Sequence, residues 1–341
     1  SIVANRLLGV IHASLAENNY SSATVMTQAI DEGMLTFYKE LSRHSPPESA
    51  DWPLAEQRKA WDDVCRLFRA PRPQRLLVED IDVDGVHIRV FRPPGEAPKP
   101  AVIYFHGGGW VLGSCETHDD MCAEMADQAD CVVVLVDYRL APEHPHPAQL
   151  EDSLKVLLWM RSSGRAFGID PDRIVGAGDS AGGQMTVGLA LVLRDHGAPQ
   201  LRGQVLIYPV LGADVNTPSY IRNAHAPCLT KPEMIFYLDC FLGPKGNPNW
   251  FDPRAIPNLA YDVKGLPPAY ISVAAHDPLF DDGVIFYDKL RAAGIPAILK
   301  EEPALAHSFM RARHVSEPAK KGFNGIVEAL RSLGHREVLP D

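Results

Sequence analysis

Long apolar runs and basic clusters are both missing from this sequence, and each absence excludes a class of partner. The longest apolar stretches, such as Cys131–Val136, have the length of a strand, whereas a helix needs about 20 apolar residues to cross a bilayer. Lys and Arg number 33 against 43 Asp and Glu, so the net charge is −10. The sequence therefore predicts no membrane span, no nucleic-acid partner and no anionic membrane surface as a partner.

Disulfide and metal patterns are also missing. The six cysteines have irregular spacing and form no Cys-x-x-Cys pair, so we expect free thiols in a reducing cytoplasm. Ser1–Arg6 shows no charged region followed by a small-residue cleavage site. His118, Asp119 and Asp120 lack further ligands at metal spacing, and we predict neither a metal nor a cofactor.

The composition is that of a globular enzyme, and the order of apolar runs predicts an α/β fold. The chain has 341 residues, of which 46% are apolar and 22% are charged, enough to bury a large core. A hairpin is expected around Asp84-Gly85, because strands that alternate in polarity flank this turn. From Pro100 onward, short apolar strands alternate with helical patterns, which favours a mostly parallel sheet covered by helices.

The spacing of apolar residues along the sequence divides the chain into four parts. Residues 1–73 have helical spacing and are expected to be an N-terminal helical cap segment. Residues 74–211 and 263–341 carry the α/β pattern and are expected to form the core. Residues 212–262 are rich in proline and aromatic residues, and we interpret this insertion as a cap or lid over the top of the sheet.

One stretch, Gly178-Asp179-Ser180-Ala181-Gly182, places a serine at a sharp turn between a strand and a helix. Glycines on both sides let the strand and the helix pass close together, and the serine hydroxyl is presented at the helix N-terminus. Such a position suits a nucleophile, because free N–H groups stabilise developing negative charge.

The same stretch also fits a dinucleotide-binding pattern. Gly176 and Gly178 with Ala181 match G-x-G-x-x-G/A, and Asp195 follows at a loosely suitable distance. That fingerprint normally lies on the first strand of its domain, whereas at least three strand-like runs precede Gly176 here. An NAD-binding oxidoreductase is therefore the alternative that this turn leaves open.

A second glycine-rich loop, His106-Gly107-Gly108-Gly109-Trp110, follows the strand expected at Ala101–Phe105. Three successive glycines imply a required backbone shape, in which N–H groups converge on one oxygen as an oxyanion hole. A phosphate loop is the alternative, but no G-K-[ST] completes a Walker motif. We expect His106 to hold the loop by hydrogen bonds rather than to act as a general base.

Five separated motifs can be considered together: His106–Gly109, Asp137–Glu143, Gly178–Gly182, His276–Gly283 and His307–Phe309. In this order they resemble the hormone-sensitive-lipase-like branch of the α/β-hydrolases, also called bacterial family IV. The resemblance covers about Val78 to Leu333, and the histidine motif, often H-G-F in that branch, has Ser308 in place of glycine.

The resemblance implies an α/β-hydrolase fold with an eight-stranded sheet and a Ser-His-Asp triad. In the order of that fold, Ser180 is the nucleophile, Asp277 the acid and His307 the base. It further implies that the backbone N–H groups of Gly108, Gly109 and Ala181 form the oxyanion hole, with His106, Gly107 and Asp179 as supporting residues. The expected activity is hydrolysis of short-to-medium acyl esters by a monomer or homodimer.

Several neighbouring residues have competing interpretations. Asp281 and Asp282 are alternative acids, although acids are common in a first helical turn. His314 is expected on a surface helix, and Cys115 lacks a turn that would present it as a nucleophile. We also expect an Arg139–Glu143 ion pair, joined by Glu151. A non-catalytic receptor on the same fold, like the plant gibberellin receptors, remains an alternative, although those depart at the catalytic histidine and this chain retains His307.

Overall fold

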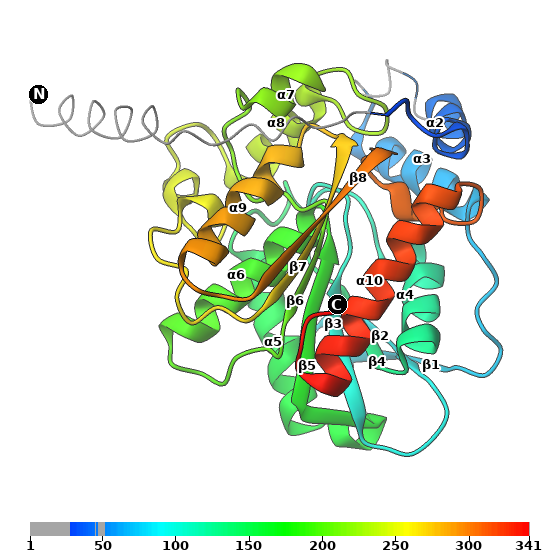
Figure 1. The fold of residues 1–341 in the computed structure, drawn as a ribbon, viewed down its shortest axis with the longest axis vertical. Coiled ribbons are helices and arrows are strands. Elements are labelled where there is room, and N and C mark those ends of the chain that lie inside the picture. The colour runs from blue at the N-terminus through cyan, green and yellow to red at the C-terminus, as the bar shows by residue number, and fades with distance from the viewer. Residues whose placement is uncertain (1–27, 45, 47–51, 341) are drawn as a thin grey trace, which may run out of the picture.

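A computed structural model describes residues 28–44, 46 and 52–340, which contain one eight-stranded sheet with helices on both faces (Figure 1). The strands are β1 (Leu77–Val83), β2 (Val86–Arg92), β3 (Lys99–Phe105), β4 (Val132–Asp137), β5 (Ile169–Asp179), β6 (Gln204–Ile207), β7 (Ala269–His276) and β8 (Ala297–Ala306). The α-helices are α2 (Glu32–His44), α3 (Leu54–Leu67), α4 (Cys115–Ala129), α5 (Ala148–Ser162), α6 (Ala181–Asp195), α7 (Pro218–Arg222), α8 (Lys231–Leu242), α9 (Phe280–Ala292) and α10 (Glu317–Arg336). Short 3-10 turns are η2 (Gly164–Phe167), η3 (Pro248–Phe251), η4 (Pro257–Leu259) and η5 (Phe309–Ala312).

The sheet is mostly parallel, as the sequence predicted. Its strand order is β1-β2-β4-β3-β5-β6-β7-β8. Strand β2 pairs antiparallel with β1 and β4, while every pair from β4 to β8 along this order is parallel. The carboxyl ends of the parallel strands therefore meet at one edge, where ligand sites of open α/β sheets form.

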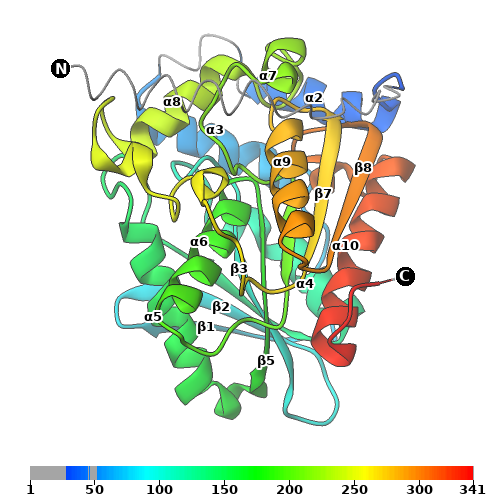
Figure 2. The same ribbon diagram turned by 60° about the vertical axis from the view of Figure 1, so that its left-hand side comes forward.

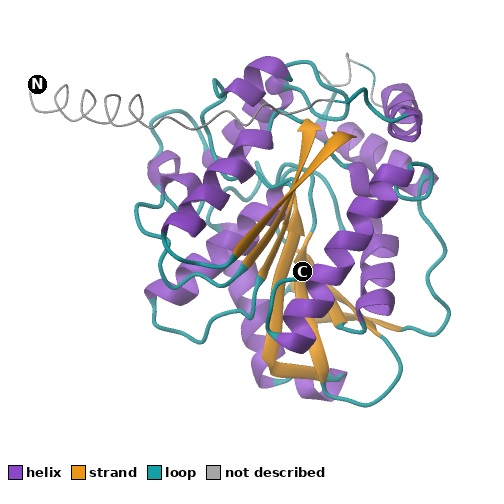
Figure 3. Cartoon of the chain, in the orientation of Figure 1, coloured by secondary structure: helices purple, strands orange, loops and turns teal. Residues whose placement is uncertain are grey.

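Two apolar cores lie on opposite faces of the sheet, because successive strand residues point to opposite sides. Along β3, Ile103 and Phe105 pack on one face and Val102 and Tyr104 on the other. Helices α5, α6 and α9 cover the first face, and α4 and α10 cover the second (Figure 3). This double coverage explains why the central strands are apolar throughout.

The carboxyl edge of the sheet is covered by two segments that are far apart in the sequence. Helices α2 and α3 come from the N-terminal part, and α7 and α8 come from the insertion 212–262 (Figure 2). The insertion is anchored on α9, where Asp282 Oδ2 accepts from the Leu211 and Gly212 N–H groups at 2.9 and 2.8 Å. Asp281 Oδ2 accepts from the Ser219 N–H at 2.7 Å. None of the helices described here is both long and apolar enough to cross a membrane.

One helix was not predicted from the sequence, and one expectation about a helical residue was wrong. The sequence patterns did not indicate α4, because acidic residues interrupt its apolar spacing; twelve of its fifteen residues are nevertheless buried. A capping box marks its start: the Ser114 Oγ accepts from the Glu116 N–H in the first turn, and the Thr117 Oγ1 accepts from the Ser114 N–H. His314 lies in a turn before α10 rather than in a helix, and its Nε2 is 2.8 Å from Glu124 Oε1.

Asp282 gives the fold a testable dependence on pH. Burial raises the pKa of this carboxyl group to about 7, against the opposing effect of its two backbone hydrogen bonds. A carboxyl group whose pKa is raised in the folded state stabilises the protein while it is protonated. This stabilisation is fully present below the pKa of the unfolded state and is lost as the pH rises through about 7. Asn keeps the shape and one acceptor oxygen but does not ionise.

We therefore expect Asp282→Asn to gain stability relative to the unchanged protein between pH 5 and pH 8, by about 3 kcal/mol. Urea unfolding at both pH values measures this difference. Burial also raises the pKa of the buried Glu302 to about 7. Glu302 is present in both proteins, so its contribution to the pH dependence of stability cancels in the difference. A stability difference that does not change with pH would contradict the assignment.

Candidate active site

The strand β5 ends at Asp179 and the helix α6 begins at Ala181, so Ser180 occupies the turn between them. Its backbone has φ 57° and ψ −117°, a conformation that a non-glycine residue rarely adopts. The flanking glycines are required by close approach: a Cβ at Gly178 would collide with the Gly182 backbone, and a Cβ at Gly182 would collide with the Phe105 carbonyl. The glycines thus let the strand and helix touch, and the serine is held at the carboxyl edge of the sheet.

His307 lies between Ser180 and Asp277. Its Nε2 is 3.0 Å from the Ser180 Oγ, and its Nδ1 is 2.7 Å from Asp277 Oδ2. Asp277 directly follows β7 and His307 directly follows β8, so adjacent parallel strands deliver both side chains to the same edge. All three residues are buried: the exposed fraction is 6% for Ser180, 5% for His307 and 1% for Asp277. A neutral imidazole in this position can accept the serine proton while donating to the carboxylate.

Asp277 is itself fixed by backbone contacts. Its Oδ1 accepts from the Leu279 N–H at 2.9 Å, and its carbonyl accepts from the Asn223 amide at 2.9 Å. Asn223 closes α7, so the insertion contacts the loop that carries the acid.

The glycine loop after β3 offers backbone donors close to the serine turn. Gly108 and Gly109 have φ values of 129° and 59°, which exclude most side chains. Their backbone N–H groups donate to no other residue in the part of the chain that the structure describes. Ala181 is the first residue of α6, where N–H groups lack an intrahelical acceptor.

A buried carboxylate ties this loop to the serine turn. Asp179 Oδ1 accepts from the Gly107 N–H at 3.0 Å and from the Tyr104 hydroxyl at 2.9 Å. Burial by itself would raise the pKa of Asp179, but the nearby His118, Arg311 and Tyr104 outweigh it and hold this pKa well below its ordinary value. Asp179 is therefore a carboxylate that fixes the first glycine of the loop relative to Ser180.

His106 lies behind the loop rather than beside the serine. Its ring stacks on Tyr138 at a centroid distance of 4.2 Å, and the Tyr138 hydroxyl donates to the His106 carbonyl at 2.7 Å. Its Nδ1 is 2.9 Å from the Gly107 carbonyl. Burial lowers the pKa of His106 to about 3, so the ring is neutral at physiological pH and holds the loop.

Comparison with known proteins places this arrangement in a family. A family profile described as "alpha/beta hydrolase fold" matches residues 102–311. The esterase LipI of Mycobacterium tuberculosis is 40% identical over 276 residues, which cover 79% of this chain and 86% of the relative. The carboxylesterase NlhH of the same bacterium is 38% identical over 282 residues, covering 80% and 88%.

The chain belongs to the α/β-hydrolase family. Among solved structures, an esterase of the bacterial hormone-sensitive lipase family matches 90% of this chain and 99% of its own, with TM-score 0.80 and 28% identity. An ester hydrolase from the metagenome of Lake Arreo matches 89% and 98%, with TM-score 0.82 and 31% identity. The chain is thus a member of the hormone-sensitive-lipase-like branch, with relatives that are named esterase and carboxylesterase, and its α/β-hydrolase fold class is as predicted.

The one departure from the branch's motifs has a visible structural consequence. Ser308, which replaces the glycine after the histidine, adopts φ 62° and ψ 21°. This left-handed conformation costs a residue with a Cβ about 1 kcal/mol, which glycine avoids.

We expect Ser308→Gly to stabilise the α/β-hydrolase by up to about 1 kcal/mol, because the relief of strain exceeds the added entropy of the unfolded chain. Urea unfolding measures this change. Ser316→Gly is the matched control, since Ser316 has an ordinary φ of −134° and caps α10, and we expect it to lose a few tenths of a kcal/mol. Destabilisation by Ser308→Gly would contradict the argument.

The structure corrects the predicted ion pair of the segment after β4. Arg139 pairs with Asp152 at 2.9 Å and with Glu151 at 2.8 Å, not with Glu143. The Glu143 carboxylate instead accepts a hydrogen bond from each terminal nitrogen of Arg58 at 2.8 Å, and Arg58 lies in α3. The Glu151 contact was predicted, but the partner of Glu143 was wrong because it lies in a different segment of the sequence.

The remaining candidates have contacts of their own. Asp119 binds Arg72 and Arg89, and Asp120 binds Arg313. The Asp281 and Asp282 carboxylates contact the insertion, as described above. Two residues that sequence reasoning missed, Tyr104 and Arg311, complete the surroundings of Asp179. Their only sequence signal is a polar group within an apolar strand and an arginine close after His307.

Proposed function

We propose that this α/β-hydrolase hydrolyses esters of short-to-medium acyl chains through an acyl-enzyme intermediate. The observation that carries the proposal is the pair of contacts of His307, at 3.0 Å to Ser180 and 2.7 Å to Asp277. A serine hydroxyl is a weak nucleophile, and a base that is itself oriented by a carboxylate is what activates it.

In the proposed mechanism, Ser180 Oγ attacks the ester carbonyl carbon while His307 Nε2 takes the hydroxyl proton. Asp277 stabilises the imidazolium and keeps Nδ1 protonated. His307 then returns the proton to the leaving alcohol, which leaves the acyl group on Ser180. Water attacks the acyl-enzyme, with His307 as the base again, and releases the acid. Gly108, Gly109 and Ala181 donate to the carbonyl oxygen while it is negatively charged.

The oxyanion role of the glycine loop has a sharp test. A Cβ on Gly109 would collide with the ring of Tyr237 from α8, so Gly109→Ala must displace the loop or the helix. We expect kcat to fall by about 100-fold or more, since the loss of one donor has this effect.

The matched control for Gly109→Ala is Gly85→Ala. Gly85 also has a positive φ, of 83°, but a Cβ there meets no atom within 4 Å. We expect this variant to lose about 1 kcal/mol of stability and to keep its kcat. Equal kinetics in the two variants would contradict a special role for Gly109.

We further propose that residues 1–73 and 212–262 act together as a cap over the core segments 74–211 and 263–341. The support is that Ser180 is nearly inaccessible and that Tyr237 of the insertion lies against Gly109. Of the 1–73 segment, only 28–44, 46 and 52–73 are described.

A cytoplasmic location is supported by six free cysteines, and we propose a monomer or homodimer without nucleic-acid partners.

The proposal is tested with p-nitrophenyl esters of increasing acyl length. We expect the acetate and butyrate to be hydrolysed with a higher kcat/KM than the palmitate. No hydrolysis of any ester would refute the enzyme proposal and would favour a binding protein on the same fold. Hydrolysis that favours the palmitate would keep the reaction class but refute the proposed chain length.

A further inference from the structure

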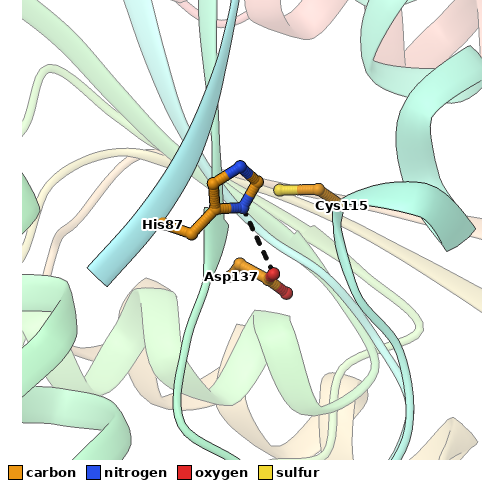
Figure 4. Close-up of side chains that lie close together, drawn as sticks. All are labelled: His87, Cys115 and Asp137. Atoms are coloured by element: carbon orange, nitrogen blue, oxygen red, sulfur yellow. Dashed lines mark hydrogen bonds and ion pairs between the residues drawn. The ribbon is translucent and has the colours of Figure 1, made fainter. Parts of the chain in front are cut away.

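Three side chains of types that can bind metals, His87, Cys115 and Asp137, lie close together (Figure 4). His87 of β2 and Asp137 of β4 lie directly opposite each other in the antiparallel pair, and opposite residues share a face of the sheet. Cys115 begins α4, which covers this face. One ligand atom from each residue lies within 4.8 Å of the other two.

The spacing suits a tetrahedral ion with nitrogen, sulfur and oxygen ligands. Zinc binds imidazole and carboxylate at about 2.0–2.1 Å, which puts two such ligands about 3.3 Å apart. His87 Nδ1 and Asp137 Oδ2 are 3.3 Å apart. The Cys115 Sγ lies no more than 4.8 Å from the other two ligand atoms. To form a zinc–sulfur bond of about 2.3 Å, it has to move closer to them by roughly 1.2 Å at most.

The surroundings provide both an entrance and an orienting group. The His87 and Asp137 side chains are 42 and 32% exposed, so an ion can enter from solvent, while Cys115 is buried. Asp80 Oδ1, which accepts from Arg89 Nε at 2.7 Å, lies 3.7 Å from His87 Nε2. This contact is too long for a hydrogen bond, but a negative charge near the outer nitrogen favours the tautomer in which the other nitrogen can face the ion.

An independent observation points to the same place. The His106 side chain is completely buried, and its Nε2 has no hydrogen-bond partner among the described residues. Buried polar nitrogens are rarely left unpaired. This nitrogen lies 4.0 Å from Asp137 Oδ1, so a water bound to an ion that Asp137 holds would supply the missing partner.

We propose that His87, Cys115 and Asp137 bind one divalent transition-metal ion of the zinc type, with a water in the fourth position. The metal–sulfur bond forms as the Cys115 thiol releases its proton to solvent. The proposal departs from the sequence prediction of no metal; the set could not be recognised in the sequence because its members are separated by 28 and 22 positions. The proposal stands on this cluster alone and does not rest on ester hydrolysis.

The experiment titrates the full chain, freed of metal with a chelator, with Co²⁺ and records the absorption spectrum. We expect one Co²⁺ per chain and a thiolate-to-cobalt charge-transfer band. Cys115→Ser should remove the band. Cys122→Ser is the matched control, because Cys122 is a buried cysteine of the same helix outside the cluster, and it should keep the band.

His87→Gln is a second test that does not depend on changing the buried Cys115. Because the His87 side chain is partly exposed, its replacement should leave the fold intact. We expect it to weaken Co²⁺ binding by more than about 100-fold, because even outer partners of ligands contribute 10- to 100-fold. The proposal is overturned if the unchanged chain shows no saturable binding, if Cys115→Ser keeps the band, or if His87→Gln binds Co²⁺ as tightly as the unchanged chain.

Discussion

Replacing Ser180 with Ala is expected to lower kcat for p-nitrophenyl butyrate by about 10⁴- to 10⁶-fold. The loss is this large because the hydroxyl is the atom that forms the acyl-enzyme, and removing the nucleophile leaves only binding and oxyanion stabilisation. The fold should be unaffected, because the strained turn depends on the glycines around Ser180 rather than on its Oγ. Steady-state kinetics and circular dichroism measure both effects.

The matched control for Ser180→Ala is Ser332→Ala. Ser332 is a buried serine of α10 whose Oγ has no hydrogen-bond partner among the described residues, so its loss should leave kcat within a few-fold. A phosphonate ester provides a second readout, since it should modify the unchanged protein once, on the peptide that contains Ser180. Modification of Cys115 instead, or retained turnover in Ser180→Ala, would refute the proposed nucleophile.

The features that the sequence predicted well are those with a local physical cause. Apolar strands in alternation with helices require a covered parallel sheet, and the order β4 to β8 follows that pattern. The serine turn was recognisable because Gly178 and Gly182 mark a close approach of backbone. The order of Ser180, Asp277 and His307 became meaningful through the family resemblance, and the structure brings the three together within hydrogen-bond distances.

The features that were missed depend on contacts between distant segments. Arg58 reaches Glu143 across 85 positions, and no periodicity within either segment reveals that partner. The network around Asp179 similarly combines Tyr104 and Arg311 from separate strands and turns. The helix α4 was missed for a related reason: its acidic side chains look solvent-exposed in sequence, but arginines from other segments pair with Asp119 and Asp120.

The identity of the acid is the second prediction with a large expected effect. We expect Asp277→Asn to lower kcat by about 10⁴-fold. Asn preserves the shape and the acceptor for the Leu279 N–H, but its amide presents N–H groups or a neutral oxygen to His307 Nδ1. The imidazolium then loses its stabilising charge and the ring favours the tautomer in which Nε2 carries the proton, so it no longer accepts the proton of Ser180.

Asp281→Asn and Asp282→Asn are the matched controls for Asp277→Asn, because the same isosteric change is made within five positions of the acid. Both carboxylates accept hydrogen bonds from the insertion, so their loss should act through the cap, mainly on KM, and change kcat by less than about 10-fold. The separation of kcat from KM distinguishes a group that stabilises the reacting histidine from one that holds the cap. If either control lost more kcat than Asp277→Asn, that residue would become the acid, and the 2.7 Å contact with His307 would be structural.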